Sequence, residues 1–248
     1  MKKVLIVTGG SRGIGAATAR LAAAAGYAVC ISYVRNEPAA SAIVREIVDA
    51  GGEALAVAAD VASEVDVIRL FERVDRELGT LTALVNNAGV LETQMRVEQM
   101  DSARIGRVFG VNVFGSILCA REAVKRMSTR RGGAGGAIVN LSSIASRLGA
   151  PNEYVDYAAA KGAIDTFTIG LAKEVAGEGI RVNAVRPGVI YTDIHASGGE
   201  PNRVERVKGS VPMQRGGNPE EVSKAIIWLL SDEASYTTGA LLDVTGGR

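Results

Sequence analysis

Short apolar runs alternate along this chain with longer stretches of helical periodicity, and this alternation constrains the fold more than any other feature. The predicted strands are residues 4–8, 28–33, 53–58, 83–86, 137–141, 181–185 and 241–244. The predicted helices are residues 14–25, 38–50, 65–78, 102–127, 154–175 and 219–230. Strands and helices that alternate at this spacing form a parallel sheet, and right-handed crossovers then place helices on both of its faces. The sequence therefore predicts a doubly wound α/β fold with a parallel seven-stranded sheet.

The composition is that of a single α/β domain. Of the 248 residues, 47% are hydrophobic and only 4% are aromatic. A core made mainly of Ala, Val, Ile and Leu suits helices that pack on a buried parallel sheet. No linker or change in composition divides residues 1–248, so we expect one domain. Residues 191–217 are glycine-rich and polar and follow a predicted strand, where substrate lids of such sheets lie.

The charge balance and the cysteines bear on partners and location. Lys and Arg together number 28 and Asp and Glu 27, which gives a net charge of +1. Proteins that bind nucleic acid or anionic membranes carry basic surfaces, so we expect neither partner here. Cys30 and Cys119 lie far apart in apolar surroundings, as free thiols of a reducing compartment do. The N-terminal apolar run is too short for a signal peptide, and no run has the length of a membrane span. We therefore expect a soluble cytoplasmic protein.

The stretch TGGSRGIG, residues 8–15, places four glycines between the first predicted strand and the first predicted helix. Glycine permits the positive φ angles of a sharp turn and lets a ligand approach the backbone closely. The N–H groups and the dipole at the start of the helix then favour a bound phosphate. The spacing Gly9-x-x-x-Gly13-x-Gly15 differs from the usual dinucleotide fingerprint. On the loop alone, a turn without a ligand stays an alternative.

Further motifs follow the glycine loop in a defined order. They are the run Asn86-Asn87-Ala88-Gly89, then Asn112, then Ser143, then Tyr157 with Lys161, and finally Pro187-Gly188 followed by Thr192. Each motif alone is weak, but the ordered set is specific. With the loop, this set resembles the short-chain dehydrogenase/reductase family, in its branch of chains of this length, over nearly the whole sequence.

The resemblance implies a Rossmann fold and an oxidoreductase that transfers a hydride between a nicotinamide cofactor and a carbonyl or alcohol substrate. It also implies that Tyr157 exchanges a proton with the substrate oxygen and that Ser143 hydrogen-bonds the same oxygen. Lys161 binds the nicotinamide ribose, and Asn112 helps to hold a proton-relay water. No metal is needed, and His195, the single histidine, cannot build a metal site alone.

The spacing of Tyr157 and Lys161 permits this chemistry, although a Tyr/Lys pair alone is usually a surface feature and only the other motifs make this one a candidate site. Residues four positions apart in a helix share one face. A free tyrosine has a pKa of about 10 and is a poor base near neutrality. A nearby ammonium favours the phenolate, so we expect Lys161 to lower the pKa of Tyr157. The pair then forms a general acid and base for a carbonyl or hydroxyl oxygen.

Two assignments stay open at this level. Ser142 and Ser143 are adjacent, and strand alternation points only one of them into the site. The resemblance favours Ser143, although its separation from Tyr157 is about one residue longer than the commonest spacing. Tyr154 lies near Tyr157, but the residue four positions after it is Ala158, which cannot act as the lysine does.

The second predicted strand bears on the choice of dinucleotide. NAD-binding loops place an acidic residue at the end of this strand to hold the ribose 2′-hydroxyl. Here no acid occurs until Glu37, while Arg12 and Arg35 are placed to reach a 2′-phosphate. We therefore expect NADP to be preferred, with NAD possible. The expected cofactor-binding residues are Gly9, Ser11, Arg12, Gly13, Ile14, Gly15, Tyr33, Arg35, Asp60, Val61, Asn87, Ala88, Gly89, Tyr157, Lys161, Pro187, Gly188, Ile190 and Thr192.

The substrate stays open, because the sequence resembles both 3-oxoacyl-thioester reductases and sugar dehydrogenases. A basic cluster, made of Lys125, Arg126, Arg130 and Arg131, fits either a phosphopantetheine carrier or a solvated helix end. A redox sensor that binds the dinucleotide without turnover is the alternative from another class, and the intact Asn, Ser, Tyr and Lys set argues against it. An epimerase or dehydratase is disfavoured, since that branch usually has a longer C-terminal domain.

The predicted helices 102–127 and 154–175 also bear on assembly. Both are long and carry small apolar residues such as Ala159 and Ala163. Proteins of the family that the chain resembles commonly pair these helices across a two-fold axis. We therefore expect a homo-oligomer, either a dimer or a homotetramer.

Overall fold

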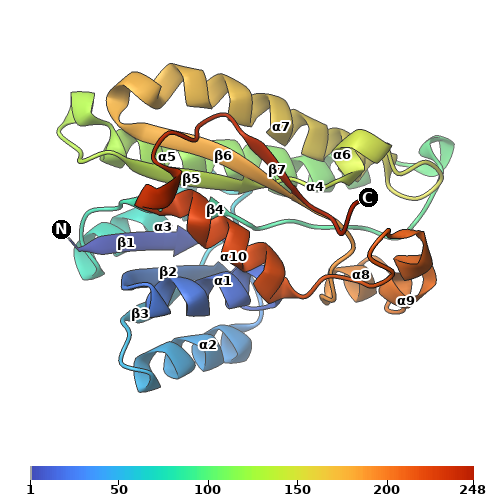
Figure 1. Cartoon of the computed structure of the whole chain (residues 1–248), viewed down its shortest axis with the longest axis horizontal. Coiled ribbons are helices and arrows are strands. Elements are labelled where there is room, and N and C mark those ends of the chain that lie inside the picture. Colours follow the sequence, from blue (N-terminus) through green and yellow to red (C-terminus); the bar gives the residue numbers. More distant parts are fainter. Residues whose placement is uncertain (1) are drawn as a thin grey trace.

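A computed structural model describes residues 2–248, and its centre is one parallel sheet of seven strands (Figure 1). The strands are β1 (Lys3–Val7), β2 (Tyr27–Tyr33), β3 (Ala54–Ala58), β4 (Ala83–Asn86), β5 (Gly136–Leu141), β6 (Ile180–Pro187) and β7 (Leu241–Val244). Their spatial order is β3-β2-β1-β4-β5-β6-β7, and every neighbouring pair is parallel. The predicted doubly wound fold is confirmed.

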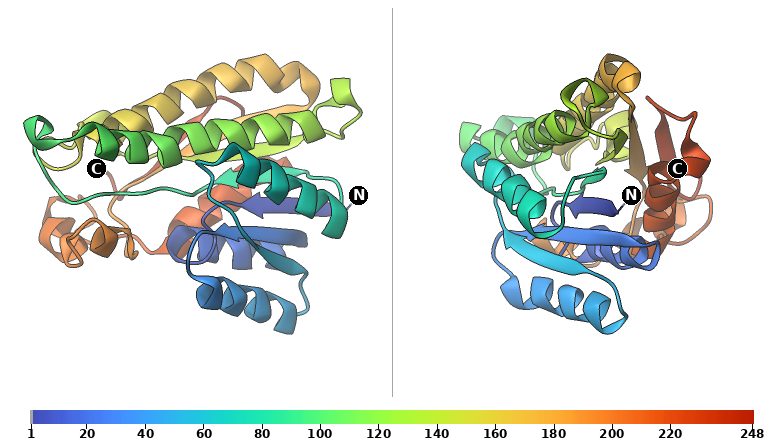
Figure 2. Two further views of the ribbon diagram at one scale, coloured as in Figure 1. Left: turned by 180° about the vertical axis from the view of Figure 1, so that it is seen from behind. Right: turned by 90° about the vertical axis from the view of Figure 1, so that its left-hand side faces the viewer.

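Helices cover both faces of this sheet (Figure 2). They are α1 (Gly13–Ala24), α2 (Glu37–Asp49), α3 (Glu64–Glu77), α4 (Ser102–Phe109), α5 (Ser116–Met127), α6 (Ala145–Leu148), α7 (Val155–Val175), α8 (Ile194–Ser197), α9 (Arg203–Val207) and α10 (Pro219–Leu230). One core lies between the sheet and α1, α2 and α10, and a second lies between the sheet and α3, α5 and α7. Alternate residues of a strand face opposite sides, so β1 contributes Leu5 and Val7 to the first core and Val4 and Ile6 to the second.

The predicted helix 102–127 is confirmed as one continuous helix, although it is not α-helical throughout. A π-helical segment, Gly110–Gly115, separates α4 from α5. It contains Asn112, whose side-chain amide donates to the carbonyl oxygen of Val108 at 2.8 Å, inside the helix itself. Side chains that bond to the helix backbone in this way distort the regular ladder, and π-helical turns are frequent at functional sites.

The same helical stretch, Ser102–Met127, is long and apolar enough to cross a membrane by length and mean hydropathy, which reaches 1.3. Buried residues nevertheless make up 44% of the apolar window. Cys119, Ala123 and Met127 face the core beneath α5, and the polar Asn112 is completely buried. In this fold the stretch is a core helix.

The carboxyl ends of the strands meet at one edge of the sheet, on the right of Figure 1. The chain leaves β1 towards β2 on one side, while β4 lies on the other side. Ligands of open α/β sheets bind at such a switch point. Residues 191–217 protrude at the same edge and carry α8 and α9. Their two ends are joined, because the Tyr191 amide donates to Gly217 and the Gly217 amide donates to Val189, each at 2.9 Å.

Candidate active site

A cavity of about 1470 Å³ opens at the carboxyl edge of the sheet. Pockets that hold a drug-sized ligand measure about 300–1,000 Å³, so this cavity has room for a dinucleotide and a second small molecule. Its wall includes most of the residues predicted for the site. They are Gly9, Ser11, Arg12, Gly13, Ile14, Tyr33, Arg35, Asp60, Val61, Asn87, Ala88, Gly89, Ser143, Tyr157, Lys161, Pro187, Gly188, Ile190 and Thr192. Gly15 and Asn112 are the two predicted residues that lie outside it.

The glycine loop has the backbone geometry of a phosphate cradle. Gly9 and Gly13 have φ angles of +63° and +54°, which favour glycine. A Cβ on Gly13 would lie 3.1 Å from the Cγ2 atom of Thr192, so the loop leaves little space there. Within residues 2–248, no side chain caps the first turn of α1 and no acidic residue lies in that turn. The free N–H groups and the helix dipole therefore fit the phosphates of a dinucleotide.

Gly15 and Asn87 connect this loop to the segment after β4. A Cβ on Gly15 would lie 2.5 Å from the Nδ2 atom of Asn87, so α1 can approach the segment after β4 only because residue 15 has no side chain. The Asn87 amide donates to the carbonyl oxygens of Thr8 and Gly9 at 2.8 and 3.0 Å. The Thr8 hydroxyl in turn accepts from the backbone amides of Asn87 and Ala88 at 3.0 Å each. Packing, rather than contact with the cavity, explains the third glycine of the motif.

Two arginines lie in the cavity wall, Arg12 from the glycine loop and Arg35 from the segment after β2. Arg12 and Arg35 both line the cavity, and Arg35 is exposed. Arg12 also donates to the Ser197 hydroxyl at 3.4 Å, which links the glycine loop to α8. Glu37 begins α2 and does not line the cavity, whereas Asp60 does. The Asp60 carboxylate accepts from the backbone amide of Ala62 at 3.0 Å.

Tyr157 and Lys161 lie on successive turns of α7 and face the same cavity. The Lys161 ammonium donates to the carbonyl oxygen of Leu141 at 2.7 Å and lies 5.5 Å from the centre of the Tyr157 ring. Desolvation raises the pKa of Tyr157 to about 12, and the Ser143 hydroxyl only partly opposes this rise. Desolvation also lowers the pKa of Lys161 to about 8. The pKa of Tyr157 in the protein alone is therefore raised overall, against the expected lowering, because desolvation outweighs the Ser143 hydrogen bond and the Arg203 charge that oppose it.

The structure distinguishes the two adjacent serines that follow β5. Both line the cavity. Ser142 is buried, and its hydroxyl donates to the backbone carbonyl of Lys161 at 3.1 Å. The Ser143 hydroxyl accepts from the backbone amide of Ala145 at 3.1 Å. It also hydrogen-bonds Tyr157, which opposes the rise in the pKa of that side chain. Ser142 thus ties β5 to α7, and Ser143 is the serine beside the tyrosine.

Asn112 lies behind the cavity wall, in the π-helical segment. Its amide donates to the Val90 carbonyl at 3.0 Å, and its side-chain oxygen accepts from the Val90 amide at 3.3 Å. A Cβ on Gly89 would lie 2.9 Å from that oxygen and 3.7 Å from the Lys161 ammonium. Gly89 therefore leaves only a narrow space between Asn112 and Lys161.

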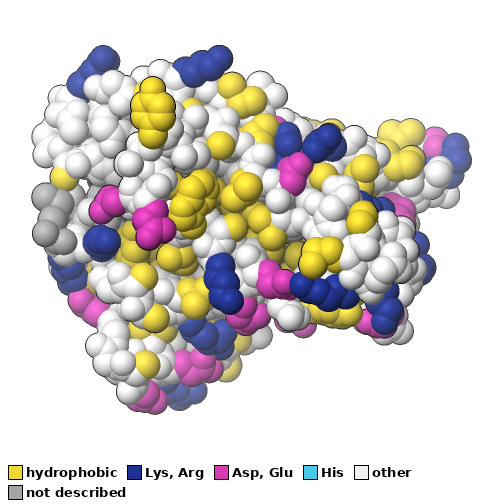
Figure 3. All heavy atoms as spheres, in the orientation of Figure 1, with side chains coloured by type: hydrophobic (Ala, Val, Ile, Leu, Met, Phe, Trp, Pro, Cys, Tyr) yellow, Lys and Arg dark blue, Asp and Glu magenta, His cyan; other side chains and the backbone are white. Residues whose placement is uncertain are grey.

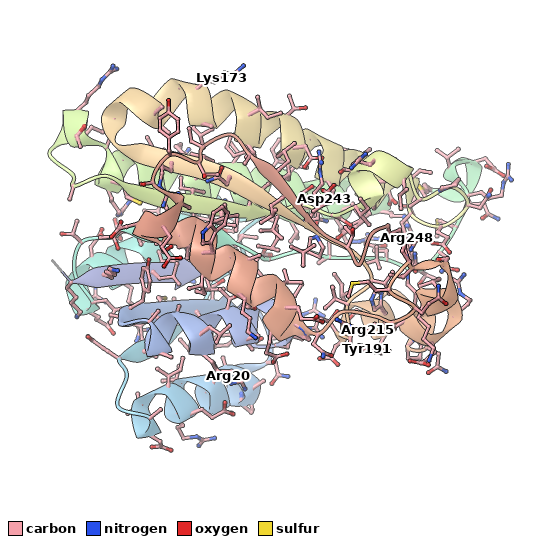
Figure 4. The ribbon with its side chains drawn as sticks, in the orientation of Figure 1. Arg20, Lys173, Tyr191, Arg215, Asp243 and Arg248 are labelled. Carbon is pink, nitrogen blue, oxygen red and sulfur yellow. The ribbon has the colours of Figure 1, made fainter. Side chains whose placement is uncertain are left out.

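The cavity wall also contains residues that were not among the individually predicted site residues. Tyr154 is buried, its hydroxyl has no partner within residues 2–248, and the Arg203 guanidinium lies 5.0 Å from the centre of its ring. His195 on α8 is buried as well, and its Nε2 atom lies 3.0 Å from the Ile190 carbonyl oxygen. Burial lowers the pKa of His195, which favours the neutral ring. Arg248, the C-terminal residue, reaches the cavity from the side of α9 (Figure 4). The predicted lid, residues 191–217, contains His195 and Arg203, and Tyr154 lies one turn before Tyr157, whereas no sequence signal marked Arg248.

Comparison with known proteins places the chain among oxidoreductases. The family described as enoyl-(acyl carrier protein) reductase matches residues 9–248. The chain is 59% identical to the uncharacterized oxidoreductase YgfF of Escherichia coli (strain K12), with 99% of each chain covered. It is 38% identical to the 3-oxoacyl-[acyl-carrier-protein] reductase of Synechocystis sp., with 99% of this chain and 96% of the relative covered. Among solved structures, a mutant short-chain dehydrogenase/reductase of Serratia marcescens is similar, with a TM-score of 0.91 and 31% identity. That likeness covers 99% of this chain and 97% of the other.

Proposed function

Because the chain belongs to the short-chain dehydrogenase/reductase family, we propose that it reduces a carbonyl group, or oxidises the matching alcohol, with NADP(H) and with Tyr157 as acid and base. The observation that carries this proposal is one shared cavity. The glycine loop forms one end of its wall, and Ser143, Tyr157 and Lys161 meet at another part. A dinucleotide held by the loop and a carbonyl beside Tyr157 would occupy the same space. The bound cofactor supplies or accepts the hydride.

In the reductive direction, Tyr157 would give its phenolic proton to the substrate oxygen. A pKa of about 12 keeps the phenol protonated near neutral pH, as a proton donor requires. Ser143 would hydrogen-bond the same oxygen and favour the charge that develops on it. The Lys161 ammonium would stabilise the phenolate that is left on Tyr157 after the transfer. We assign Asn112 to holding a relay water near Lys161, across the space beside Gly89.

The cofactor preference is proposed from two arginines, Arg12 in the glycine loop and Arg35 after β2. Both line the cavity, while Glu37 lies outside it. Guanidinium groups recognise phosphate through paired hydrogen bonds, which favours the 2′-phosphate of NADP(H) over the 2′-hydroxyl of NAD(H). The other residues predicted to contact the cofactor, among them Tyr33 and Thr192, are proposed to bind the same molecule.

We propose that residues 191–217 form the substrate lid of a single domain. Thr192, Ile194 and His195 of this lid line the cavity, as does Arg203. Ion pairs of 2.6 and 2.9 Å connect Arg203 and Arg206 to Glu153, which lies just before α7. The lid is thereby anchored to the segment that leads into the proposed catalytic helix.

Two exposed apolar surfaces support a homotetramer, which needs two kinds of interface. Phe114, Ile117 and Ile169 are exposed on the π-helical segment, α5 and α7. Trp228 on α10 and Tyr236 are exposed too, and apolar side chains gather over α10 and β7 (Figure 3). A monomer in light scattering at micromolar concentration would contradict this proposal.

Cys30 and Cys119 are free thiols, which supports the proposed cytoplasmic location.

The test of the function is a substrate panel. The purified protein is mixed with NADPH or NADH and a 3-oxoacyl thioester, a sugar or a cyclic ketone, and nicotinamide absorbance is followed. Turnover of at least one carbonyl is the expected result. The relatives are named as oxidoreductases and do not favour a non-catalytic sensor. Tight dinucleotide binding without turnover of any carbonyl or alcohol would favour that alternative instead.

A further inference from the structure

We propose that Arg104 and Asp156 are positioning residues that fix Tyr157 relative to the wall segment after β4. The inference rests on the proposed role of Tyr157 as proton donor. Neither residue lines the cavity, and both are buried. They would act through the backbone of α7 and not by contact with the substrate.

The first turn of α7 depends on Asp156. Helices leave their first backbone N–H groups without partners, and a capping side chain usually accepts from one of them. Tyr154, at the N-cap position of α7, makes no such hydrogen bond within residues 2–248. The Asp156 carboxylate instead accepts from the backbone amide of Tyr157 at 2.9 Å. The negative charge of Asp156 in the first turn also interacts favourably with the positive end of the helix dipole. Asp156 therefore holds the backbone of the proposed acid.

Arg104 determines the orientation of that carboxylate. Its Nε atom donates to the Asp156 Oδ2 atom at 2.7 Å, and its Nη2 atom lies 3.4 Å from Oδ1. The exposed fractions of the two side chains are 3% and 4%. A buried carboxylate without a partner is costly, so Asp156 keeps its place only while Arg104 faces it.

The same guanidinium also binds the segment after β4. The Arg104 Nη1 atom donates to the backbone carbonyl of Thr93 at 2.6 Å. Thr93 belongs to the segment after β4, whose residues from Asn87 to Glu92 line the cavity. Arg104 itself lies on α4, in the same continuous helix as Asn112. One side chain thus joins α4, the segment after β4 and the first turn of α7.

This arrangement favours a geometric role over a purely stabilising one. A buried ion pair contributes little stability compared with apolar side chains of similar volume, whereas removal of one partner alone is strongly destabilising. An apolar replacement of both residues therefore separates the two roles. It can keep the fold while it removes the hydrogen bonds to Tyr157 and Thr93.

The experiment compares the parent with the double variant Arg104→Met/Asp156→Leu. The control is Arg20→Met/Glu46→Leu, which makes the same substitutions in an exposed 2.6 Å ion pair between α1 and α2, outside the cavity wall. Arg20 is labelled in Figure 4, away from the lid. The measurements are kcat and KM on an accepted carbonyl, dinucleotide affinity by calorimetry, the melting temperature, and hydrogen exchange of the peptide that covers residues 155–161.

We expect kcat of the double variant to fall by at least about tenfold, while dinucleotide affinity stays within about twofold of the parent. Exchange at the start of α7 should accelerate, and the control should match the parent in every measurement. Arg104→Lys keeps a positive charge beside the Asp156 carboxylate but lacks the further N–H group that bonds to Thr93. Its kcat should therefore lie between those of the parent and the double variant.

Two results would overturn the proposal. In one, kcat stays within about twofold of the parent and exchange is unchanged. In the other, kcat, dinucleotide affinity and melting temperature all fall together, as general damage to the fold would cause. A parent protein without turnover on any carbonyl would refute the proposed function instead. The exchange measurement needs no substrate and decides the positioning role in that case as well.

Discussion

The two ends of the cavity are built in different ways. The dinucleotide end consists mainly of backbone: Gly9 and Gly13 at positive φ, and the Asn87 amide bonded to two loop carbonyls. The lid end consists of long polar side chains: Arg203 and Arg206 form ion pairs with Glu153, and Gln94 donates to Glu200 at 2.5 Å. A backbone held in an unusual conformation has few alternative conformations. Partly exposed ion pairs, by contrast, each contribute little to stability and rearrange easily. We infer that the dinucleotide end is rigid and that the lid end adapts to its ligand.

The largest effect is expected at the point where the two ends meet. Tyr157→Phe removes only the phenolic oxygen, so kcat should fall by about a hundredfold or more, the usual contribution of a general acid. Dinucleotide affinity, measured by calorimetry, should stay within about twofold, because the glycine loop is untouched. Retention of more than about a tenth of the parent kcat would show that another group donates the proton.

The rigidity of the dinucleotide end is tested by Gly9→Ala. Its Cβ would lie 3.0 Å from the backbone Cα atom of Ala88, and alanine disfavours a φ of +63°. We expect dinucleotide affinity to weaken by at least about tenfold, since the loop must shift. Gly26→Ala is the control, because Gly26 also has a positive φ of +85° but no atom near its Cβ. Equal losses of dinucleotide affinity in both variants would refute a specific role of the loop.

The charge at the dinucleotide end is tested by Arg35→Ala. A charge-assisted hydrogen bond to phosphate is worth about tenfold or more in affinity, so the ratio of kcat/KM for NADPH to that for NADH should narrow by about that factor. The change should appear mainly in the KM for NADPH. Arg45→Ala, an exposed change on α2 outside the cavity wall, is the control. A parent ratio at or below one would overturn the proposed preference for NADP(H).

The pH dependence of reduction tests the coupling of Lys161 to Tyr157. The pKa of Lys161 is about 8, so its ammonium is present below that pH and is lost above it. Without the ammonium, the phenolate formed on Tyr157 is less stable and proton donation slows. We expect kcat for reduction to fall by several-fold, up to about tenfold, as the pH rises through about 8. A rate that stays constant or rises over this range would contradict the assignment.

The smallest effect is expected at the lid. Glu153→Gln removes the charge that holds Arg203 and Arg206 but keeps the size of the side chain. Because partly exposed ion pairs are weak, we expect the KM for the carbonyl substrate to rise by only about threefold, with dinucleotide affinity unchanged. A loss as large as that of Gly9→Ala would show that the lid end is as rigid as the dinucleotide end.

The sequence by itself determined the sheet, the glycine loop and the pair Tyr157 and Lys161. These features depend on local spacing: alternation in strands, glycine at positive φ, and a four-residue step in a helix. The apolar runs predicted all seven strands to within a few residues of their observed bounds. Sequence order and spacing also placed the predicted dinucleotide contacts at one edge of the sheet, where all of them except Gly15 line the cavity.

Only the tertiary structure decided the features that depend on distant parts of the chain. The direction of the pKa shift of Tyr157 follows from desolvation, which depends on everything packed around the ring. Arg104 and Asp156 are 52 residues apart, so no local pattern announces their pairing. The hydrogen bonds between Asn112 and Val90 likewise join two segments that are separate in the sequence. Local periodicity encodes which face a residue occupies, but burial and long-range partners exist only once the chain has packed.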